Sequence, residues 1–368
     1  MRLIACALAF AAAFVTSARA QTEDWARVVE AARKEGEVLV WGQAGDDRRK
    51  FWKDSFEKAY PGIVVRLFQP GSTSERDTRF LREFESGVAK VDVLVSGSAG
   101  MNGRLRPSGA LRPLRPLLRP EVIDGKNWVD GEPFWTDPQK EFIIVSDQPV
   151  GAAVIANMSI PADAIKSWND LLDPKYDGKI ISLDPRQSGQ MFALSLFLYY
   201  SRDLGPDYVG KLFRKGRITF TQDQRQIIEW VESGRMSLAF GVREPEIAAL
   251  EKVGGEVRVF PALEANGKLQ SILVGADGAA GVPNLDPLPH PNATRVYLNW
   301  FFSKEGQQAM VNILGVTSTH TGVDMSKLSP RLLRAPGAQY TSANDDRLNG
   351  ADTAKAMRDT VTRAIEGR

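Results

Sequence analysis

Short apolar strands alternate with amphipathic helices through the first hundred residues, and this alternation limits the possible folds more than any other feature. Each apolar run is short and is bounded by glycine, proline or polar residues, as strands are. A chain that alternates in this way forms a parallel sheet with helices on its faces. The pattern predicts strands at 37–42, 63–69 and 91–97, and helices at 22–36, 46–60 and 71–87.

The same alternation starts again after residue 150 and predicts a second α/β lobe. The fold class that we expect is therefore α/β, with two lobes that each contain a mostly parallel sheet flanked by helices. An apolar strand at 271–282, helices within 289–310 and a terminal helix at 353–367 complete the prediction. The second lobe is predicted to have strands at 151–157, 179–183, 236–241 and one that ends near Thr221, the last three each followed by a helix.

Residues 1–20 have the features of a secretory signal peptide, with an arginine near the start, an apolar core and a small-residue cleavage site at Ala18–Ala20. The segment is too short to span a membrane. We expect cleavage near Ala20-Gln21 and a mature protein in the periplasm. Cys6 is the single cysteine of the chain and lies in this leader, so we expect neither a disulfide nor a catalytic thiolate in the mature protein.

The charge composition gives no support for nucleic-acid binding. The leader carries two of the 47 basic residues and none of the 45 acidic residues, so the mature chain has no net formal charge. A nucleic-acid-binding domain normally shows a marked basic excess. We therefore expect no nucleic-acid partner.

Small polar residues follow each of the first three predicted strands, at the edge of the sheet where such folds bind ligands. We expect ligand contacts from Gln43 after the first strand, from Ser72 and Thr73 after the second, and from Ser96 and Ser98 after the third. The hydroxyl residues also head predicted helices, so capping of those helices is the structural alternative.

The stretch Asp-Pro-Arg-Gln-Ser-Gly-Gln at 184–190 leads directly into a long apolar helix. The first turn of a helix has unpaired N–H groups and a partial positive charge, which together suit an anion. We expect Ser188, Gly189 and Gln190 to hold the charged part of a ligand, with Arg186 beside them. The alternative is that Ser188 only caps the helix.

Polar residues also follow two other strands of the second lobe. Arg243 and Glu244 come after one strand, and an arginine there can bind a carboxylate or phosphate through two parallel hydrogen bonds. Gln222 follows a neighbouring strand, and we expect all three residues to contact the ligand. The structural alternative for Arg243 is a salt bridge with Glu246.

Two motifs carry a resemblance to a known family. They are "SWNDLLDPKYDGKI" at 167–180 and "PHPNATRVYLNWFFSKEGQQAM" at 289–310. With them the chain resembles the periplasmic substrate-binding proteins of ABC importers, in the class that contains the ferric-iron binders. The resemblance implies two α/β lobes joined by crossover strands, with the ligand in the cleft between them. The expected first lobe comprises 21–151 and 271–322, and the expected second lobe comprises 152–270 and 323–368.

The resemblance also suggests what kind of ligand is bound. Ferric members hold their metal with a histidine, a glutamate and two adjacent tyrosines, but the matching positions here are near Gly45, at Gly97 and at Glu244-Pro245. They hold an accompanying anion at a Ser-Gly turn, which this chain keeps at Ser188-Gly189. What is implied is a monomeric receptor that needs no metal or other cofactor, binds a small organic anion bearing phosphate, phosphonate or carboxylate, and docks onto an ABC permease.

Three alternatives remain open. The first is a receptor for ferric iron that uses Glu244, Asp46, Asp47 and a bound anion. The second is a receptor that signals through a membrane sensor instead of a transporter. The third is a secreted enzyme, which is disfavoured because the sequence has only two histidines and lacks H-E-x-x-H, G-x-S-x-G and Walker A motifs. We therefore do not expect an enzyme.

Overall fold

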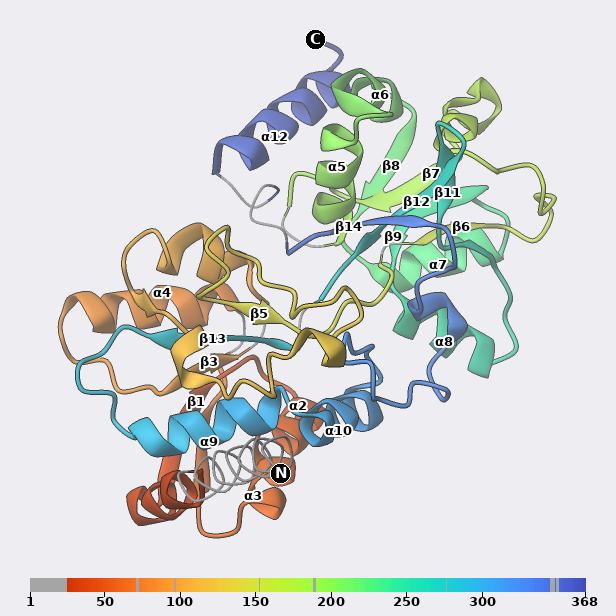
Figure 1. The fold of residues 1–368 in the computed structure, drawn as a ribbon. Helices are drawn as coiled ribbons and strands as arrows, with labels where there is room; N and C mark the ends of the chain where they lie inside the picture. The colour runs from red at the N-terminus through yellow and green to blue at the C-terminus, as the bar shows by residue number, and fades with distance from the viewer. Residues whose placement is uncertain are drawn as a thin grey trace, which may run out of the picture.

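A computed structural model describes residues 25–368, apart from 71–72, 96, 152, 188–189, 276, 345–347 and 349–350. Figure 1 shows the chain folded into two lobes, with several segments passing between them. The predicted signal peptide lies outside the described residues, as do four of the predicted ligand contacts, which are Ser72, Ser96, Ser188 and Gly189.

The sheet of the first lobe has the strand order β2-β1-β3-β13-β4, with β5 also paired to β13. Strands β1, β2 and β3 are mutually parallel, whereas β13 runs antiparallel to β3, β4 and β5. The sheet is mixed because β13 returns from the second lobe in the opposite direction. Its strands are β1 (Glu37–Trp41), β2 (Val64–Phe68), β3 (Val93–Val95), β4 (Leu111–Arg112), β5 (Ile144–Val145) and β13 (Ala279–Pro283).

Helices cover both faces of this sheet because its strands are apolar on both faces. Val93 and Val95 pack into one core with Trp52, while Leu94 between them packs into the opposite core with Phe80. This alternation follows from the two-residue repeat of a strand. The helical segments are residues 25–35, α2 (Asp46–Arg49), a π-helical stretch (Lys50–Ser55), α3 (Phe56–Ala59), α4 (Thr73–Glu85), a second π-helical stretch (Met101–Leu105), α9 (Pro291–Phe301) and α10 (Lys304–Leu314), with short 3-10 turns at Arg115–Leu117 and Gly125–Asn127.

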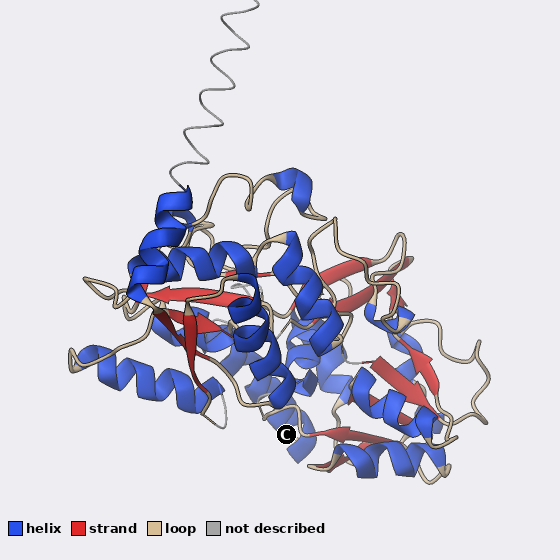
Figure 2. Ribbon diagram, turned by 90° about the horizontal axis from the view of Figure 1, so that it is seen from below, coloured by secondary structure: helices blue, strands red, loops and turns tan. Residues whose placement is uncertain are grey.

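The sheet of the second lobe has the strand order β10-β6-β9-β7-β8. Strand β7 is parallel to β8 and β9, and β6 is antiparallel to β9 and β10. Its strands are β6 (Ala153–Ala156), β7 (Ile180–Leu183), β8 (Ile218–Thr221), β9 (Leu238–Val242) and β10 (Arg258–Phe260), and its helices are α5 (Gln190–Tyr200), α6 (Gly205–Leu212), α7 (Gln224–Glu232) and α8 (Glu244–Lys252), with 3-10 turns at Trp168–Leu172 and Pro174–Tyr176. Figure 2 shows helices around the strands of both lobes, so the predicted two-lobe α/β class is confirmed.

The C-terminal part of the chain completes the second lobe. A small sheet joins β11 (Leu263–Ala265), β12 (Lys268–Leu273) and β14 (Gln339–Ser342), and β14 is parallel to β12. The predicted terminal helix is present as α12 (Ala351–Glu366), and its Met357 and Val361 are fully buried in the core of this lobe. A 3-10 turn at Pro330–Leu332 precedes β14.

The single strand predicted at 271–282 is wrong, because this stretch forms two strands in two lobes. Strand β12 ends at Leu273 in the second lobe, and β13 begins at Ala279 in the first. Between them the buried carboxylate of Asp147 accepts hydrogen bonds from the backbone N–H groups of Asp277, at 3.0 Å, and Gly278, at 2.7 Å. A side chain at position 278 would clash, because its Cβ would lie 2.7 Å from the backbone nitrogen of Asp147.

Three stretches connect the lobes, at 146–152, 274–278 and 315–338. The last stretch is held on both sides. Arg334 donates to Asp130 of the first lobe at 3.0 Å, and Arg331 donates to Glu244 of α8 in the second lobe at 2.8 Å. We propose lobe boundaries in which 21–151 and 274–322 form the first lobe and 152–273 and 323–368 form the second; the expected start of the returning segment at 271 moves to 274 because β12 stays in the second lobe through Leu273.

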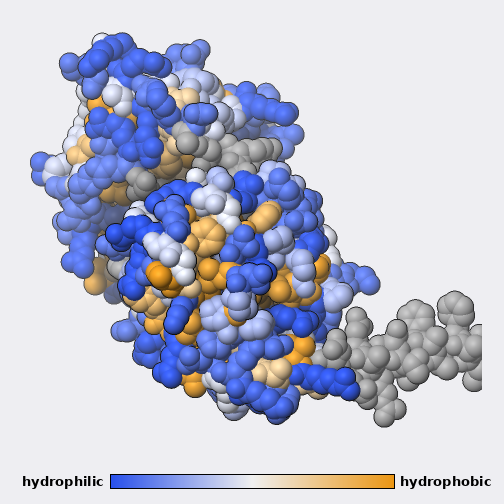
Figure 3. Space-filling view, turned by 90° about the vertical axis from the view of Figure 1, so that its left-hand side faces the viewer, coloured by the Kyte–Doolittle hydropathy of each residue, from blue (hydrophilic) through white to orange (hydrophobic). Residues whose placement is uncertain are grey.

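The face of the molecule in Figure 3 is mostly hydrophilic, and its hydrophobic side chains form small scattered groups. Among the described residues, no helix combines the length and the apolar character that a membrane span requires.

Candidate functional site

The first two strand ends of the first lobe are joined by a glutamine. Gln69 follows β2 and donates from its side-chain amide to the backbone carbonyl of Gln43, which follows β1, at 2.8 Å. Gln43 is half-buried at this edge of the sheet, and Thr73, also half-buried, begins α4 after β2. Both predicted contacts therefore lie at the expected edge of the sheet, and their contact with a ligand stays a prediction.

Arg48 is a residue that sequence reasoning missed. It lies in α2, just after the loop that contains Gln43, and its Nη2 donates to Asp277 Oδ2 at 3.2 Å while its Nε makes a second, closer contact with Oδ1. Its Nη1 donates to the backbone carbonyl of Ala44 at 3.1 Å. All three guanidinium nitrogens are thus engaged, and Arg48 ties the first-lobe strand ends to the stretch that crosses between lobes.

Ser98 is fully buried, which differs from the expectation of a hydroxyl available to a ligand. Its hydroxyl donates to Asn344 Oδ1 at 2.7 Å, and Asn344 in turn donates to the backbone carbonyl of Gly275 at 3.1 Å. The β3 strand end is therefore bonded to the C-terminal segment. A ligand contact by Ser98 would require this bond to break.

The turn at 184–190 begins with an internal ion pair. Arg186 donates from Nε to Asp184 Oδ1 at 2.9 Å and from Nη2 to Asp184 Oδ2 at 2.6 Å. The hydrogen bonds from Arg186 lower the pKa of the Asp184 carboxyl. The Arg186 side chain is 37% exposed, and no partner of its Nη1 is found among the described residues. Asp184 therefore orients the guanidinium and leaves one nitrogen for an anion.

The turn is also held from the C-terminal helix. Arg358 of α12 donates from Nε to the backbone carbonyl of Arg186 at 3.1 Å, and its guanidinium lies 4.4 Å from the ring centroid of Phe192 in α5. Gln190 is the first residue of α5, and its Oε1 is buried without a hydrogen-bond partner among the described residues. Because an amide oxygen only accepts hydrogen bonds, an anion at the predicted position would be bound by the N–H groups of Gln190.

The other predicted contacts of the second lobe are engaged locally or exposed. Arg243 forms a close ion pair with Glu246 through Nη2, which is the structural alternative expected from the sequence. Both carboxylate oxygens of Glu244 accept hydrogen bonds from Arg331 at 2.8 Å, so Glu244 is drawn toward the lobe connection and away from a ligand role. Gln222 is exposed just after β8.

No group of three or more His, Cys, Asp or Glu side chains that could hold a metal ion occurs in the part of the chain that the structure describes. Glu244 is paired with Arg331, and Asp47 is paired with Lys50 at 2.8 Å. His290 is bonded to the buried Asp92, with 2.8 Å between Nδ1 and Oδ2. Two of the three residues suggested for an unusual ferric site, Glu244 and Asp47, are therefore engaged elsewhere.

Two mixed α/β sheets, joined by crossing stretches and with polar strand ends, define a two-lobe solute receptor of the periplasmic binding-protein type. The model of the bacterial extracellular solute-binding proteins matches residues 52–333, and the chain belongs to this family. Proteins of this family serve ABC transporters, for which they bind a small solute and dock onto a permease. No curated protein matches the chain.

Solved structures of two-lobe receptors share the fold. AfuA from Actinobacillus pleuropneumoniae, with fructose-6-phosphate bound, is 17% identical with a TM-score of 0.59, over 90% of this chain and 99% of its own. Iron-bound HitA from Pseudomonas aeruginosa is 17% identical with a TM-score of 0.62, over 88% and 99%. IdiA (FutA) from Trichodesmium, in complex with iron and citrate, is 16% identical with a TM-score of 0.65, over 89% and 98%.

Proposed function

We propose that this protein is a monomeric periplasmic receptor that captures a small organic anion bearing phosphate, phosphonate or carboxylate and delivers it to an ABC permease. The observation that carries this proposal is the position of two arginines of the second lobe. Arg186 and Arg243 each follow the carboxyl end of a strand, and their side chains are 37% and 50% exposed. Ligands of open α/β sheets bind at these strand ends, where a guanidinium recognises an oxyanion.

The second lobe supplies the free donors. Asp184 uses Nε and Nη2 of Arg186, and Glu246 uses only Nη2 of Arg243. A guanidinium has five N–H groups, so both side chains can bind an anion while they keep their carboxylate partners. The charged head of the ligand would lie on Arg186 and the N–H groups of Gln190, and the sequence prediction adds Ser188 and Gly189.

The first lobe would close over the body of the ligand. Gln43 and Thr73 lie at its strand ends, and neither contributes a charge to the site. Ligand binding would shift an existing equilibrium from the open form toward the closed form, because only the closed form contacts the ligand from both lobes. Two of the solved relatives hold such anions, since one contains fructose-6-phosphate and another contains citrate with iron.

The test is native mass spectrometry of residues 21–368 purified without refolding, followed by thermal shifts with phosphate, fructose-6-phosphate, citrate and ferric iron. A ligand that binds only the folded state at a hundredfold excess over Kd stabilises it by about 2.7 kcal/mol. We expect one organic anion to raise the melting temperature, and Arg186→Ala to reduce its affinity at least about tenfold.

Arg214→Ala is the matched control. Arg214 is also an exposed arginine of the second lobe paired to an aspartate, Asp177, but it precedes β8 and lies away from the strand ends. Equal losses in the two variants would contradict the proposal. Iron that a chelator removes, without an organic anion, would instead support the ferric alternative.

A further inference from the structure

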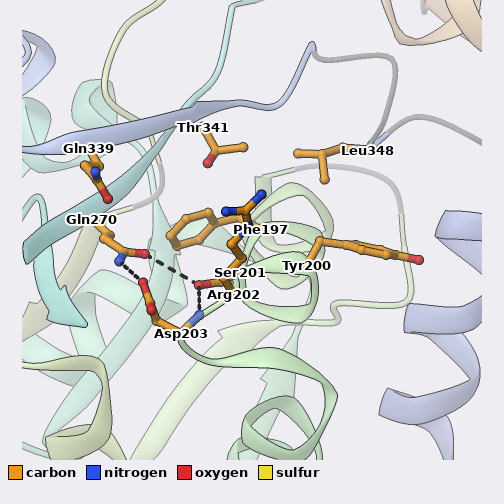
Figure 4. A pocket seen from close by; sticks show the side chains of 9 residues that line it. All are labelled: Phe197, Tyr200, Ser201, Arg202, Asp203, Gln270, Gln339, Thr341 and Leu348. Carbon is orange, nitrogen blue, oxygen red and sulfur yellow. Dashed lines mark hydrogen bonds between the residues drawn. The ribbon is translucent and has the colours of Figure 1, made fainter. Parts of the chain in front are cut away.

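A pocket of 470 Å³ lies on the second lobe between the C-terminal end of α5 and strands β12 and β14 (Figure 4). None of the residues that line it belongs to the strand ends described above. Gln190 and Tyr200 are the first and last of the eleven residues of α5, so the helix is roughly 16 Å long. The pocket, at the Tyr200 end, is therefore separate from the predicted anion position at the Gln190 end.

Three polar side chains reach this pocket without a partner. Arg202 follows α5, and Gln339 and Thr341 belong to β14. Among the described residues, none of their side chains makes a hydrogen bond or an ion pair, and Figure 4 shows them around the opening. A guanidinium, an amide and a hydroxyl that converge without partners form a set of donors for an oxygen-bearing ligand.

Among the described residues that line the pocket, the one carboxylate is already engaged. Asp203 accepts a hydrogen bond from Gln270 Nε2 at 2.6 Å and another from Asn266 Nδ2 at 3.1 Å. Figure 4 shows Asp203 turned toward Gln270. Arg202 and Asp203 are the charged residues in the described part of the lining, and they are not paired with each other. Asp203 repels a dianion such as phosphate more strongly than a single carboxylate, whose one charge Arg202 can balance.

The rest of the lining is apolar and partly aromatic. Phe197 and Leu348 are buried, and Tyr200 is 42% exposed while its hydroxyl donates to the backbone carbonyl of Thr353 at 3.2 Å. A pocket with a few placed polar groups and an apolar wall is the usual form of a small-molecule site. These side chains would cover the uncharged body of a ligand.

We propose that this pocket is a second binding site, specific for a small organic monocarboxylate with an aromatic or apolar body. Arg202 binds the carboxylate, and Thr341 and Gln339 donate the remaining hydrogen bonds. Phe197 and Tyr200 pack against the body of the ligand. The site goes beyond the proposed receptor function, because its ligand would bind beside α12 and not between the lobes.

The test is isothermal titration of the mature chain with benzoate, with benzyl alcohol and phenyl phosphate as matched probes. We expect benzoate to bind with one-to-one stoichiometry and at least about tenfold more tightly than either of the other two. Arg202→Gln should reduce benzoate affinity at least about tenfold, because it removes the positive charge that pairs with the carboxylate. Arg202 is exposed, so the substitution should not disturb the fold. Thr341→Val should give a smaller loss.

Two control variants separate this site from the cleft. Arg235→Gln changes an arginine of the same lobe whose guanidinium lies over the Trp230 ring, and it should leave benzoate binding unchanged. Arg186→Ala tests the other site, because loss of benzoate binding in that variant would place benzoate in the cleft. The proposal is overturned if benzoate does not bind, if Arg202→Gln binds it normally, or if Arg186→Ala abolishes binding. Failure of the anion receptor proposal would show instead as normal anion binding by Arg186→Ala.

Discussion

The strand ends of the two lobes hold their polar groups in different ways. In the first lobe, Arg48 is paired with Asp277, and Ser98 is bonded to Asn344, so the partners come from distant parts of the chain. In the second lobe, Arg186 is paired with Asp184 two residues away, and Arg243 with Glu246 three residues away. The first-lobe edge is therefore held by hydrogen bonds to distant segments of the chain, and the second-lobe edge is held by ion pairs within its own turns.

This difference separates two tasks. A group that is buried and bonded to a lobe connection contributes to the geometry of the hinge, and it costs free energy to release. An ion pair between neighbours in the sequence whose guanidinium is part-exposed, as those of Arg186 (37%) and Arg243 (50%) are, contributes less to stability and can bind an anion with small loss. We therefore expect the first-lobe edge to dominate stability and the second-lobe edge to dominate ligand affinity.

The largest effect is expected from Asp147→Ala. This substitution leaves the buried N–H groups of Asp277 and Gly278 without their acceptor, so the free energy of unfolding should fall by about 3 kcal/mol. Asp184→Ala is the matched change at the other edge and should cost about 1 kcal/mol or less. Urea denaturation at neutral pH measures both, and equal costs would remove the distinction between the two edges.

A smaller effect is expected from Ser98→Ala. The variant loses the bond to Asn344 and leaves a buried amide oxygen unpaired, so unfolding should become easier by about 1–2 kcal/mol. Arg243→Ala, its counterpart in the second lobe, should change the free energy of unfolding by less than about 0.5 kcal/mol. Thermal denaturation compares them. The expectation fails if Arg243→Ala proves the more damaging change.

The smallest effect is a difference in pH dependence. The pKa of Asp184 is lowered by its bonds to Arg186, so its stabilisation is present above the unfolded-state pKa near about 3.9 and is lost as pH falls through the lower folded-state pKa. Burial raises the pKa of Asp92 in the first lobe, and this group favours the folded state more as pH falls.

Asp184→Asn should therefore flatten the acid side of the stability curve by less than about 1 kcal/mol. Denaturant titrations at a series of pH values between about 5 and 2 measure this slope. A variant whose slope below about pH 4 matched that of the parent chain would show that Asp184 makes no such contribution.

Local pattern was enough to predict most of the fold. The strands that became β1, β7, β8 and β9 were visible as apolar runs between turn residues, and the helix at α12 was visible from its periodicity. Strand β14 was missed because "QYTS" is polar, short and mostly part-exposed, so it has no apolar signature. The stretch at 271–282 was predicted wrongly because its two strands are both apolar and only residues 274–278 separate them.

The same contrast explains what could be predicted of the site. The pair Arg243–Glu246 was foreseen as an alternative because its members are three residues apart on one helix turn. Arg48 and Asp277 are 229 residues apart, so no local pattern joins them. The one sequence signal that could have indicated a special role for Asp277 is the position of a charged Asp-Gly pair within an apolar stretch. Contact between a ligand and the predicted residues stays a prediction.

The position of α12 has a consequence for the order of biosynthesis. The second lobe begins with β6 but is completed by β14 and by Met357 and Val361 of α12, which belong to the last thirty residues of the chain. A polypeptide made from its N-terminus finishes α10, the last helix of the first lobe, while β14 and α12 are still to be added. A chain that stalls before Met357 therefore has its first lobe assembled beside an unfinished second one.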